Sequence, residues 1–151
     1  MKILTAKESK QIRLNYINKF LNKNTDLFQH EISKPKLYSD GYCYCGYMWD
    51  TFLNPRLIGY DQAIKKIMSS EFIYVLWDIN SCENIFIQNY WKYPKKRILL
   101  IPTAEFKKIS DTLPEDIYIF DETFEWTIAL THEDIGGARY CLYQKAINSS
   151  T

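Results

Sequence analysis

The sequence contains no apolar run long enough for the core of a signal peptide or for a membrane-spanning helix. We therefore expect a cytoplasmic protein with no membrane partner. Thiols stay reduced in that compartment, so the four cysteines, Cys43, Cys45, Cys82 and Cys141, do not predict a disulfide framework. Proline or glycine clusters that would mark a domain boundary are also missing, and the length predicts a single domain over residues 1–151.

Several chemical signatures are missing as well. The sequence has no glycine-rich phosphate loop and no nucleotide fingerprint, so no cofactor is expected. Cys43 and Cys45 are close together, but the second cysteine pair or paired histidines of a structural zinc site are lacking. We therefore expect no metal site, and no cysteine has the local signature of a catalytic nucleophile.

Charge is distributed unevenly, although the net charge is only +1. Residues 1–36 hold eight lysines or arginines against three acids. Residues 111–134 hold eight acids and no lysine or arginine. Aromatic residues make up 16% of the chain, which suits a thick core or a binding face. The chain thus has a basic end and an acidic end.

The spacing of apolar residues predicts an α+β fold. A Thr5–Glu8 capping box precedes a helical pattern over about 6–23. Three shorter helices are expected. One lies near residues 48–53, a second begins after Asp61, which serves as its N-cap, and a third covers 103–109 with Thr103 as its N-cap. Apolar or alternating runs predict strands at 71–78, 85–88, 97–101, 116–120, 125–133 and 138–144. Helices early and strands late predict a mostly antiparallel sheet of about five to six strands, covered on one face by mainly N-terminal helices.

The acidic run of residues 111–134 has two interpretations. It is either a set of solvated turns or a surface that binds a basic protein. In the second case carboxylates steer the partner and aromatic side chains anchor it. The residues expected to make these contacts are Asp121, Glu122, Glu125, Glu133 and Asp134 for charge, with Trp126 and Tyr118 as anchors.

His132 and Glu133 provide an alternative, a small hydrolase-type enzyme. On a regular strand these neighbours point to opposite faces, so an acid–base pair would need another partner such as Asp50 or His30. The alternative to a catalytic role is that His132 is a structural residue that forms hydrogen bonds at the end of a strand.

A third hypothesis is an RNA-binding module at WKYPKKR, residues 91–97. Aromatic residues alternate there with four positive charges, the mixture that phosphate attraction and base stacking require. The isoelectric point near 7.6 and the acidity of residues 111–134 argue against a polyanionic partner, so nucleic acid is not expected to bind.

Two segments, GYMWDTF (46–52) and LPEDIYIFDETFEWTIALTHED (113–134), are similar to hallmarks of a group of small uncharacterised bacterial proteins. The shared pattern is a Trp-Asp helix, a Pro-Glu-Asp turn, an Asp-x-x-Phe-x-Trp-Thr segment and a Thr-His-Glu ending. Such proteins resemble the immunity proteins that accompany polymorphic and contact-dependent toxins. The resemblance implies a cytoplasmic inhibitor that neutralises a cognate toxin domain, such as a nuclease. It implies no catalytic residue and leaves the oligomeric state open.

Overall fold

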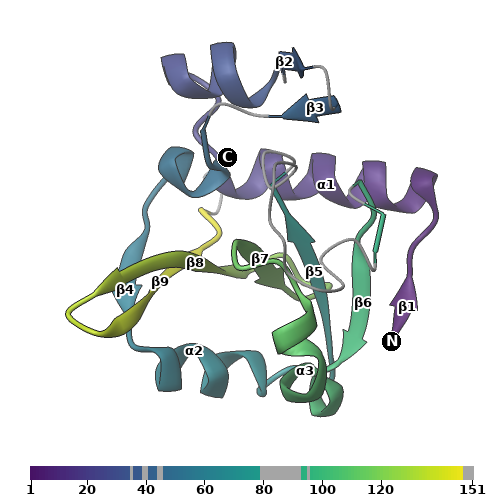
Figure 1. Cartoon of the computed structure of the whole chain (residues 1–151), viewed down its shortest axis with the longest axis vertical. Coiled ribbons are helices and arrows are strands. Elements are labelled where there is room, and N and C mark those ends of the chain that lie inside the picture. The colour runs from purple at the N-terminus through teal and green to yellow at the C-terminus, as the bar shows by residue number, and fades with distance from the viewer. Residues whose placement is uncertain (35, 39–40, 44–45, 79–92, 95, 148–151) are drawn as a thin grey trace.

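The computed structural model of the chain describes all residues except 35, 39–40, 44–45, 79–92, 95 and 148–151. A seven-stranded sheet lies at its centre, with strand order β1-β6-β5-β7-β8-β9-β4 and antiparallel pairing throughout (Figure 1). Its strands are β1 (Lys2–Ile3), β4 (Arg56–Ile58), β5 (Phe72–Trp77), β6 (Leu99–Pro102), β7 (Ile117–Phe120), β8 (Trp126–Ile135) and β9 (Ala138–Lys145). A second sheet pairs only β2 (Lys36–Tyr38) with β3 (Gly41–Cys43). The predicted α+β class with an antiparallel sheet is confirmed.

The helices are short apart from the first. The α-helices are α1 (Ala6–Phe20), α2 (Tyr60–Ile67) and α3 (Thr103–Ile109). Single turns of other helix types are η1 (Phe28–Ile32), η2 (Met48–Thr51) and η3 (Ser110–Thr112). No helix in the described part of the chain combines the length and the apolar character that crossing a membrane requires.

The start of α1 matches the capping box that the sequence predicts. The Glu8 amide donates to the Thr5 hydroxyl at 3.2 Å, and the Thr5 amide donates to the Glu8 carboxylate at 2.7 Å. These two bonds satisfy amides that the first helical turn leaves without partners. The caps of α2 and α3 differ from the prediction, because Gly59 precedes α2 and Pro102 precedes α3. Thr103 instead donates its hydroxyl to the carbonyl of Ser70 at 2.8 Å.

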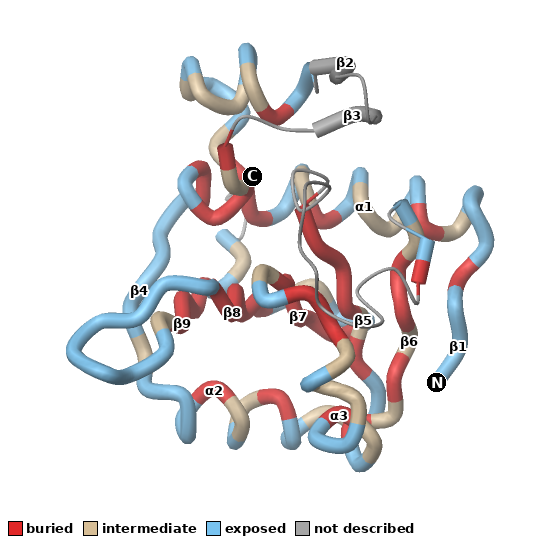
Figure 2. The backbone as a smooth tube through the Cα atoms, viewed as in Figure 1, coloured by how far each residue is buried: buried red, intermediate tan, exposed pale blue. Residues whose placement is uncertain are grey.

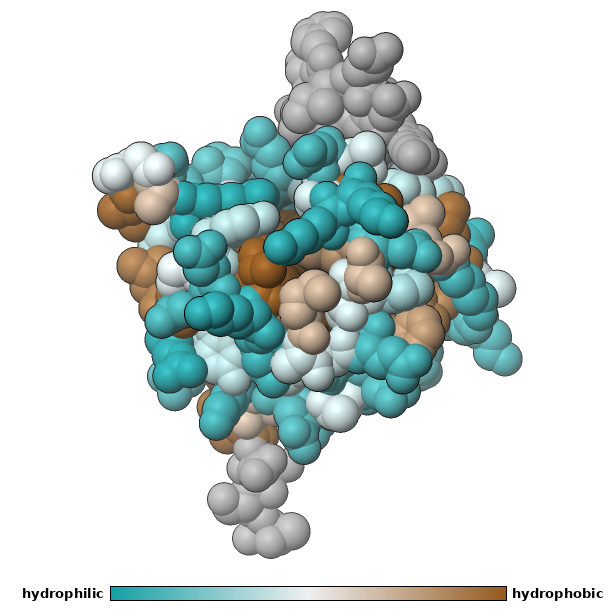
Figure 3. All heavy atoms as spheres, turned by 90° about the horizontal axis from the view of Figure 1, so that it is seen from below, coloured by the Kyte–Doolittle hydropathy of each residue, from teal (hydrophilic) through white to brown (hydrophobic). Residues whose placement is uncertain are grey.

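Both faces of the sheet are buried (Figure 2). One face packs against α2 and α3, whose outward surface is largely hydrophilic (Figure 3). The other face packs against α1 and η2. Side chains of the first face include Ile73, Val75, Trp77, Ile119 and Ile128, and those of the second include Leu76, Tyr118, Phe120, Ala129 and Leu142.

Two details of the prediction need correction. Helices cover both faces of the sheet and not one, and the sheet has seven strands and not five to six. Ile117–Phe120 explains the first difference, because all four consecutive residues of this strand are buried. A strand whose side chains are apolar on both sides requires cover on both sides. Two strands of this sheet were not predicted, the edges β1 and β4, which have only two and three residues. The strand predicted over 85–88 lies outside the described residues.

The β8–β9 hairpin turns through Gly136 and Gly137, which have φ angles of 63° and 81°. Ile135 and Ala138 pair directly on either side, so the loop has two residues. A two-residue turn with both φ angles positive matches the twist of its strands, and glycine adopts that conformation without steric cost. The turn carries the hairpin tip out of the body of the molecule, where it is exposed (Figures 1 and 2).

Candidate functional site

The acidic run does not form one surface. Glu122 and Glu125 lie in the turn between β7 and β8, whereas Glu133 and Asp134 lie near the far end of β8. Glu133 is eight positions after Glu125 along a mostly extended chain, which corresponds to roughly 25 Å. The expectation of a single acidic face over these residues is therefore wrong, because the strand between them is buried and holds the two groups apart.

Asp121 is buried and serves the fold. Its carboxylate accepts hydrogen bonds from the Ser70 hydroxyl at 2.6 Å, from the Trp126 indole at 2.7 Å and from the Thr123 amide at 3.1 Å. Burial alone would raise the pKa of Asp121, but these hydrogen bonds outweigh it and hold the pKa below its usual value. The prediction that Asp121 contacts a partner is wrong in this structure.

The two expected aromatic anchors are buried as well. Trp126 lies on the face covered by α2, with the Lys66 ammonium 4.8 Å from its ring centroid. Tyr118 has no exposed surface, and its hydroxyl accepts from the Trp49 amide at 3.1 Å. Both expectations need correction for one reason. Trp126 and Tyr118 lie on strands whose side chains are buried on both faces of the sheet, so neither ring is available to a partner.

Glu122 and Glu125 are exposed, as predicted. Glu125 shares a surface hollow with Lys66 and Lys145, so its charge lies among cations of the same molecule. Charges of opposite sign in one hollow screen one another. This end of β8 is therefore a poor source of negative potential.

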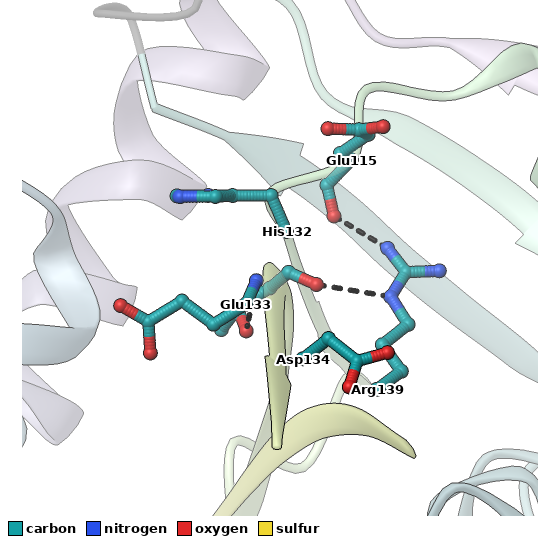
Figure 4. Close-up of a pocket in the computed structure, with 6 residues that line it drawn as sticks. Glu115, His132, Glu133, Asp134 and Arg139 are labelled. Carbon is teal, nitrogen blue, oxygen red and sulfur yellow. Dashed lines mark hydrogen bonds between the residues drawn. The ribbon is translucent and has the colours of Figure 1, made fainter. Parts of the chain in front are cut away.

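A second group of carboxylates gathers at the other end of β8. Glu115, Glu133 and Asp134 line a hollow of about 310 Å³ together with His132 and Arg139 (Figure 4). Asp50, Glu115, Glu133 and Asp134 are exposed and Asp116 is half-buried. We call this group of five carboxylates, Asp50, Glu115, Asp116, Glu133 and Asp134, the acidic end.

Asp116 fixes His132 within the acidic end. One carboxylate oxygen of Asp116 lies 2.8 Å from Nδ1 of His132 and accepts from the His132 backbone amide at 2.7 Å. Sequence reasoning missed this partner. The register could have revealed it, because Ile117 pairs with Leu130 and the residues beyond them, Asp116 and Thr131–His132, then meet across the strands.

The alternation expected for His132 and Glu133 does not hold. Thr131, His132 and Glu133 lie opposite a single residue of β9, Tyr140, because pairing jumps from Leu130–Cys141 to Asp134–Arg139. Extra residues in one strand bend it and redirect its side chains. His132 and Glu133 consequently extend toward the same side in Figure 4.

Arg139 lies in the same hollow as Glu115, Glu133 and Asp134, so its positive charge offsets part of theirs, although no ion pair with them is found among the described residues. Its guanidinium donates to two backbone carbonyls, that of Thr131 at 3.1 Å and that of Glu115 (Figure 4). Asp134 uses a carboxylate oxygen to accept from the Gly137 amide at 2.6 Å. Among the described residues, no lysine or arginine forms an ion pair with a carboxylate of the acidic end.

Two aromatic rings at the start of η2 lie beside His132, that of Tyr47, the residue before η2, and that of Trp49. Tyr47 and Trp49 are stacked with centroids 4.1 Å apart, and the His132 ring is 5.3 Å from Tyr47 and 6.0 Å from Trp49. Burial raises the pKa of Asp50, and the charge of Glu133 raises it further. The pKa of Tyr47 is raised by burial first and then by the charges of nearby carboxylates, including Asp116. The negative charges of the acidic end therefore act on Tyr47 and Asp50, at the start of η2 and within it.

A buried carboxyl, Asp78, supports η2 from beneath. It accepts from the Met48 amide at 3.2 Å and from the Tyr118 hydroxyl at 2.5 Å. Burial raises its pKa to about 7, although those hydrogen bonds and the charge of Arg13 act in the opposite direction. Sequence reasoning did not identify Asp78, because an aspartate directly after a strand is also typical of a turn.

Other candidates lie partly or wholly outside the described residues. Cys45, Cys82 and the side chain of Cys43 lie outside the described part of the structure. Within WKYPKKR, Tyr93 is buried, and Arg97 donates to the Leu4 carbonyl at 3.1 Å. The Tyr93 ring therefore cannot stack on a base, and the Arg97 guanidinium is already engaged within the protein. Among the side chains that the structure does describe, no cluster suited to a metal ion is found.

In comparisons with protein-family models, with curated proteins and with solved structures, nothing matches this chain.

Proposed function

We propose that the protein is an immunity protein that binds and neutralises a cognate bacterial toxin domain, for which a nuclease is the best-fitting class. The observation that carries the proposal is the acidic end. Five carboxylates meet there, and no described lysine or arginine side chain forms an ion pair with them. The proposal keeps Glu133 and Asp134 as contacts and adds Asp50, Glu115 and Asp116. It drops the buried residues Asp121, Trp126 and Tyr118, and also the exposed Glu122 and Glu125 at the opposite end of β8.

Electrostatics explain why such a surface suits an inhibitor of a nuclease. A nuclease carries positive charge where it holds phosphates, and inhibitors with matching negative charge associate faster. Like charges held close together also repel one another in the free protein: burial is the main cause of the raised pKa of Asp50, and the charge of Glu133 adds to it. A cationic partner relieves that repulsion.

The test uses the C-terminal domain of the secreted protein encoded by the neighbouring gene. Co-expression of this chain should restore growth to cells that express that domain. In binding kinetics, the double variant Glu115→Gln/Glu133→Gln should associate several-fold more slowly at low salt and depend less on salt. Neither side chain makes a described hydrogen bond, so the fold should be retained.

A matched control removes the same number of charges from the opposite end. Glu122→Gln/Glu125→Gln should associate at nearly the unaltered rate, because these residues lie roughly 25 Å away along β8. Equal slowing by both double variants would contradict a role for the acidic end. A neighbouring gene that encodes no toxin would contradict the immunity function itself.

One observation favours a second candidate, a hydrolase. Asp116 holds Nδ1 of His132 at 2.8 Å, the arrangement that orients a histidine for proton transfer through Nε2. Hydrolysis of p-nitrophenyl acetate well above the buffer rate, and its loss in His132→Gln, would support this candidate. Equal rates for the unaltered protein and the variant would contradict it.

A further inference from the structure

A second hollow lies beside the last turns of α1. Its volume is about 620 Å³, twice that of the hollow at the acidic end and within the range of small-molecule sites. It is enclosed by residues 15–19 of α1, by Leu53 after η2, by the turn before β8 and by Ile147 after β9. Figure 1 shows the segment after β9 rising toward the end of α1. We call this space the α1 hollow.

Hydrogen bonds between segments hold the walls of the α1 hollow in place. The Leu53 amide donates to the Phe20 carbonyl at 3.1 Å, and the Gln144 side-chain amide donates to the same carbonyl at 2.9 Å. On the other side, the Ala146 amide donates to the Glu125 carbonyl at 2.8 Å. The hollow is therefore preformed, and the carbonyl at the end of α1 is already occupied by two donors.

Three apolar side chains that reach the surface line the α1 hollow. Leu53 is 39% exposed, Ile147 is 49% exposed and Phe124 is half-buried. In the part of the chain that the structure describes, Phe124 is also the sole residue other than glycine with a positive φ angle, 51°. A residue with a Cβ adopts that conformation at a cost, and such strain is concentrated at ligand sites. The turn before β8 thus accepts strain at the residue whose ring lines the hollow.

The polar side chains that α1 contributes to the hollow present hydrogen-bond donors. The Lys23 ammonium donates to the side-chain oxygen of Asn18 at 2.9 Å, and Gln11 donates to the side-chain oxygen of Asn15 at 3.1 Å. Because an ammonium can only donate, its partner on Asn18 must be the oxygen, which leaves the NH2 group for a ligand. Within the described chain, the Lys19 ammonium forms no hydrogen bond or ion pair.

The charge of the α1 hollow is positive. Lys19 lines it, and no carboxylate does so among the described residues. Glu122 and Glu125 are close along the chain, but Glu125 lines a different hollow that also contains two lysines. The charge of Glu122 acts on Tyr74, where it adds to the effect of burial in raising the pKa of that hydroxyl. A ligand in the α1 hollow therefore meets one ammonium and several neutral groups.

We propose that the α1 hollow binds a small organic acid with one carboxylate and an apolar or aromatic body. The carboxylate accepts hydrogen bonds from the Lys19 ammonium and from the amide groups of the two asparagines, and a bond that joins opposite charges is stronger than a neutral one. The body of the ligand rests on the Phe124 ring and on the aliphatic side chains beside it. This site does not depend on the acidic end, so it stands or falls separately from the immunity function.

The test is a titration of the whole chain with 4-phenylbutyrate, followed by amide NMR. The signals of residues 15–19, 53, 123–124 and 147 should shift and saturate with a Kd on the order of 1 mM, as expected for a ligand of this size. 4-Phenylbutylamine has the same shape and the opposite charge, and it should bind at least tenfold more weakly. Absence of saturable shifts at these residues, or equal or tighter binding of the amine, would overturn the proposal.

Matched variants separate the site from unspecific binding. Lys19→Gln should weaken 4-phenylbutyrate about tenfold, because a charged hydrogen bond is lost, and should not weaken the amine. Lys10→Gln removes another exposed lysine of α1 that does not line the hollow, and it should leave both affinities unchanged.

The apolar wall has its own pair of variants. Ile147→Ser should weaken the acid about fivefold through lost apolar contact, whereas Leu57→Ser, at an exposed position outside the α1 hollow, should not. All four positions are exposed, so the fold should be retained in each variant. Equal losses in a site variant and its control would show that the acid binds elsewhere and would overturn the proposal.

Discussion

The hydroxyl of Tyr118 donates a hydrogen bond of 2.5 Å to the carboxylate of Asp78, and both side chains are fully buried. Asp78 also holds the Met48 amide at the start of η2, so one carboxyl joins the end of β5, the middle of the sheet and the segment beside the acidic end. A change in its protonation state therefore alters the hydrogen bonds that join β5, the sheet and η2.

We expect Asp78 to make the protein less stable as pH rises. Its pKa is about 7 in the folded protein against an ordinary value of 3.8, so the folded state retains a proton that the unfolded state releases. The stabilisation is complete below about pH 4 and is lost as pH rises through about 7, a change of the order of 4 kcal/mol. Urea unfolding from pH 4.5 to 8 should show this decline, and Asp78→Asn should reduce it. An identical pH dependence in the variant would rule out Asp78 as the source.

Asp121→Ala should destabilise the protein by about 2–4 kcal/mol. The change leaves the buried Trp126 indole without its acceptor, which costs about 1–3 kcal/mol. The hydroxyl of the half-buried Ser70 and the amide of the exposed Thr123 lose the same acceptor and add less, because water can replace it. Chemical denaturation measures the effect. The neighbouring variant Glu122→Ala is the control, because its exposed side chain should change stability by less than about 0.5 kcal/mol. A similar small effect at Asp121 would show that the carboxylate is not a structural hub.

At position 124, a glycine variant should be more stable than an alanine variant, the reverse of the usual order in a helix. The φ angle of Phe124, 51°, lies in the left-handed region, which costs a residue with a Cβ about 1–2 kcal/mol. Contacts of its ring with Phe120 and Tyr74, at centroid distances of 5.2 and 6.4 Å, offset that cost. Both substitutions lose the ring, but Phe124→Gly should be about 1 kcal/mol more stable than Phe124→Ala. At the exposed helical position Lys10 the order should be the reverse.

Thr5→Ala should cost about 1 kcal/mol of unfolding free energy. The threonine hydroxyl accepts from the Glu8 amide, and the cap also positions the Glu8 side chain for its return bond. Thermal and urea unfolding should both register the loss. Lys7→Ala, an exposed position in the same turn, should have little effect, and comparable losses at both sites would argue against the cap.

The sequence predicted regular structure well where the pattern was long. The α1 helix and the strands β5 to β9 follow from capping chemistry, helical spacing and apolar runs, which are local properties of the chain. The edge strands β1 and β4 have too few residues to leave a pattern of their own. Helices were expected on one face only, although all four residues of Ile117–Phe120 are apolar, a pattern that requires cover on both faces of the sheet.

The candidate site was harder to predict, because it depends on distances between segments. Clustering in sequence suggested one acidic surface, but a buried strand carries Glu125 and Glu133 to different ends of the molecule. Asp116 and Asp50 join the site only through strand register and through the packing of η2. Trp126 and Tyr118 could have been excluded from the surface, since each alternates with apolar neighbours on a central strand.

The irregular segment of β8 has a consequence for evolution. Three residues of β8, Thr131, His132 and Glu133, lie opposite one residue of β9, so β8 has two more residues here than its partner strand. Loss of His132 and Glu133 together would return the hairpin to uniform pairing with Asp134 and Ile135 on their present sides. Loss of either one alone would leave a single extra residue opposite Tyr140, a β-bulge that keeps the pairing of Asp134 with Arg139. Length changes of one or two residues at this position should therefore be tolerated, and His132 and Glu133 can be gained or discarded without rebuilding the sheet.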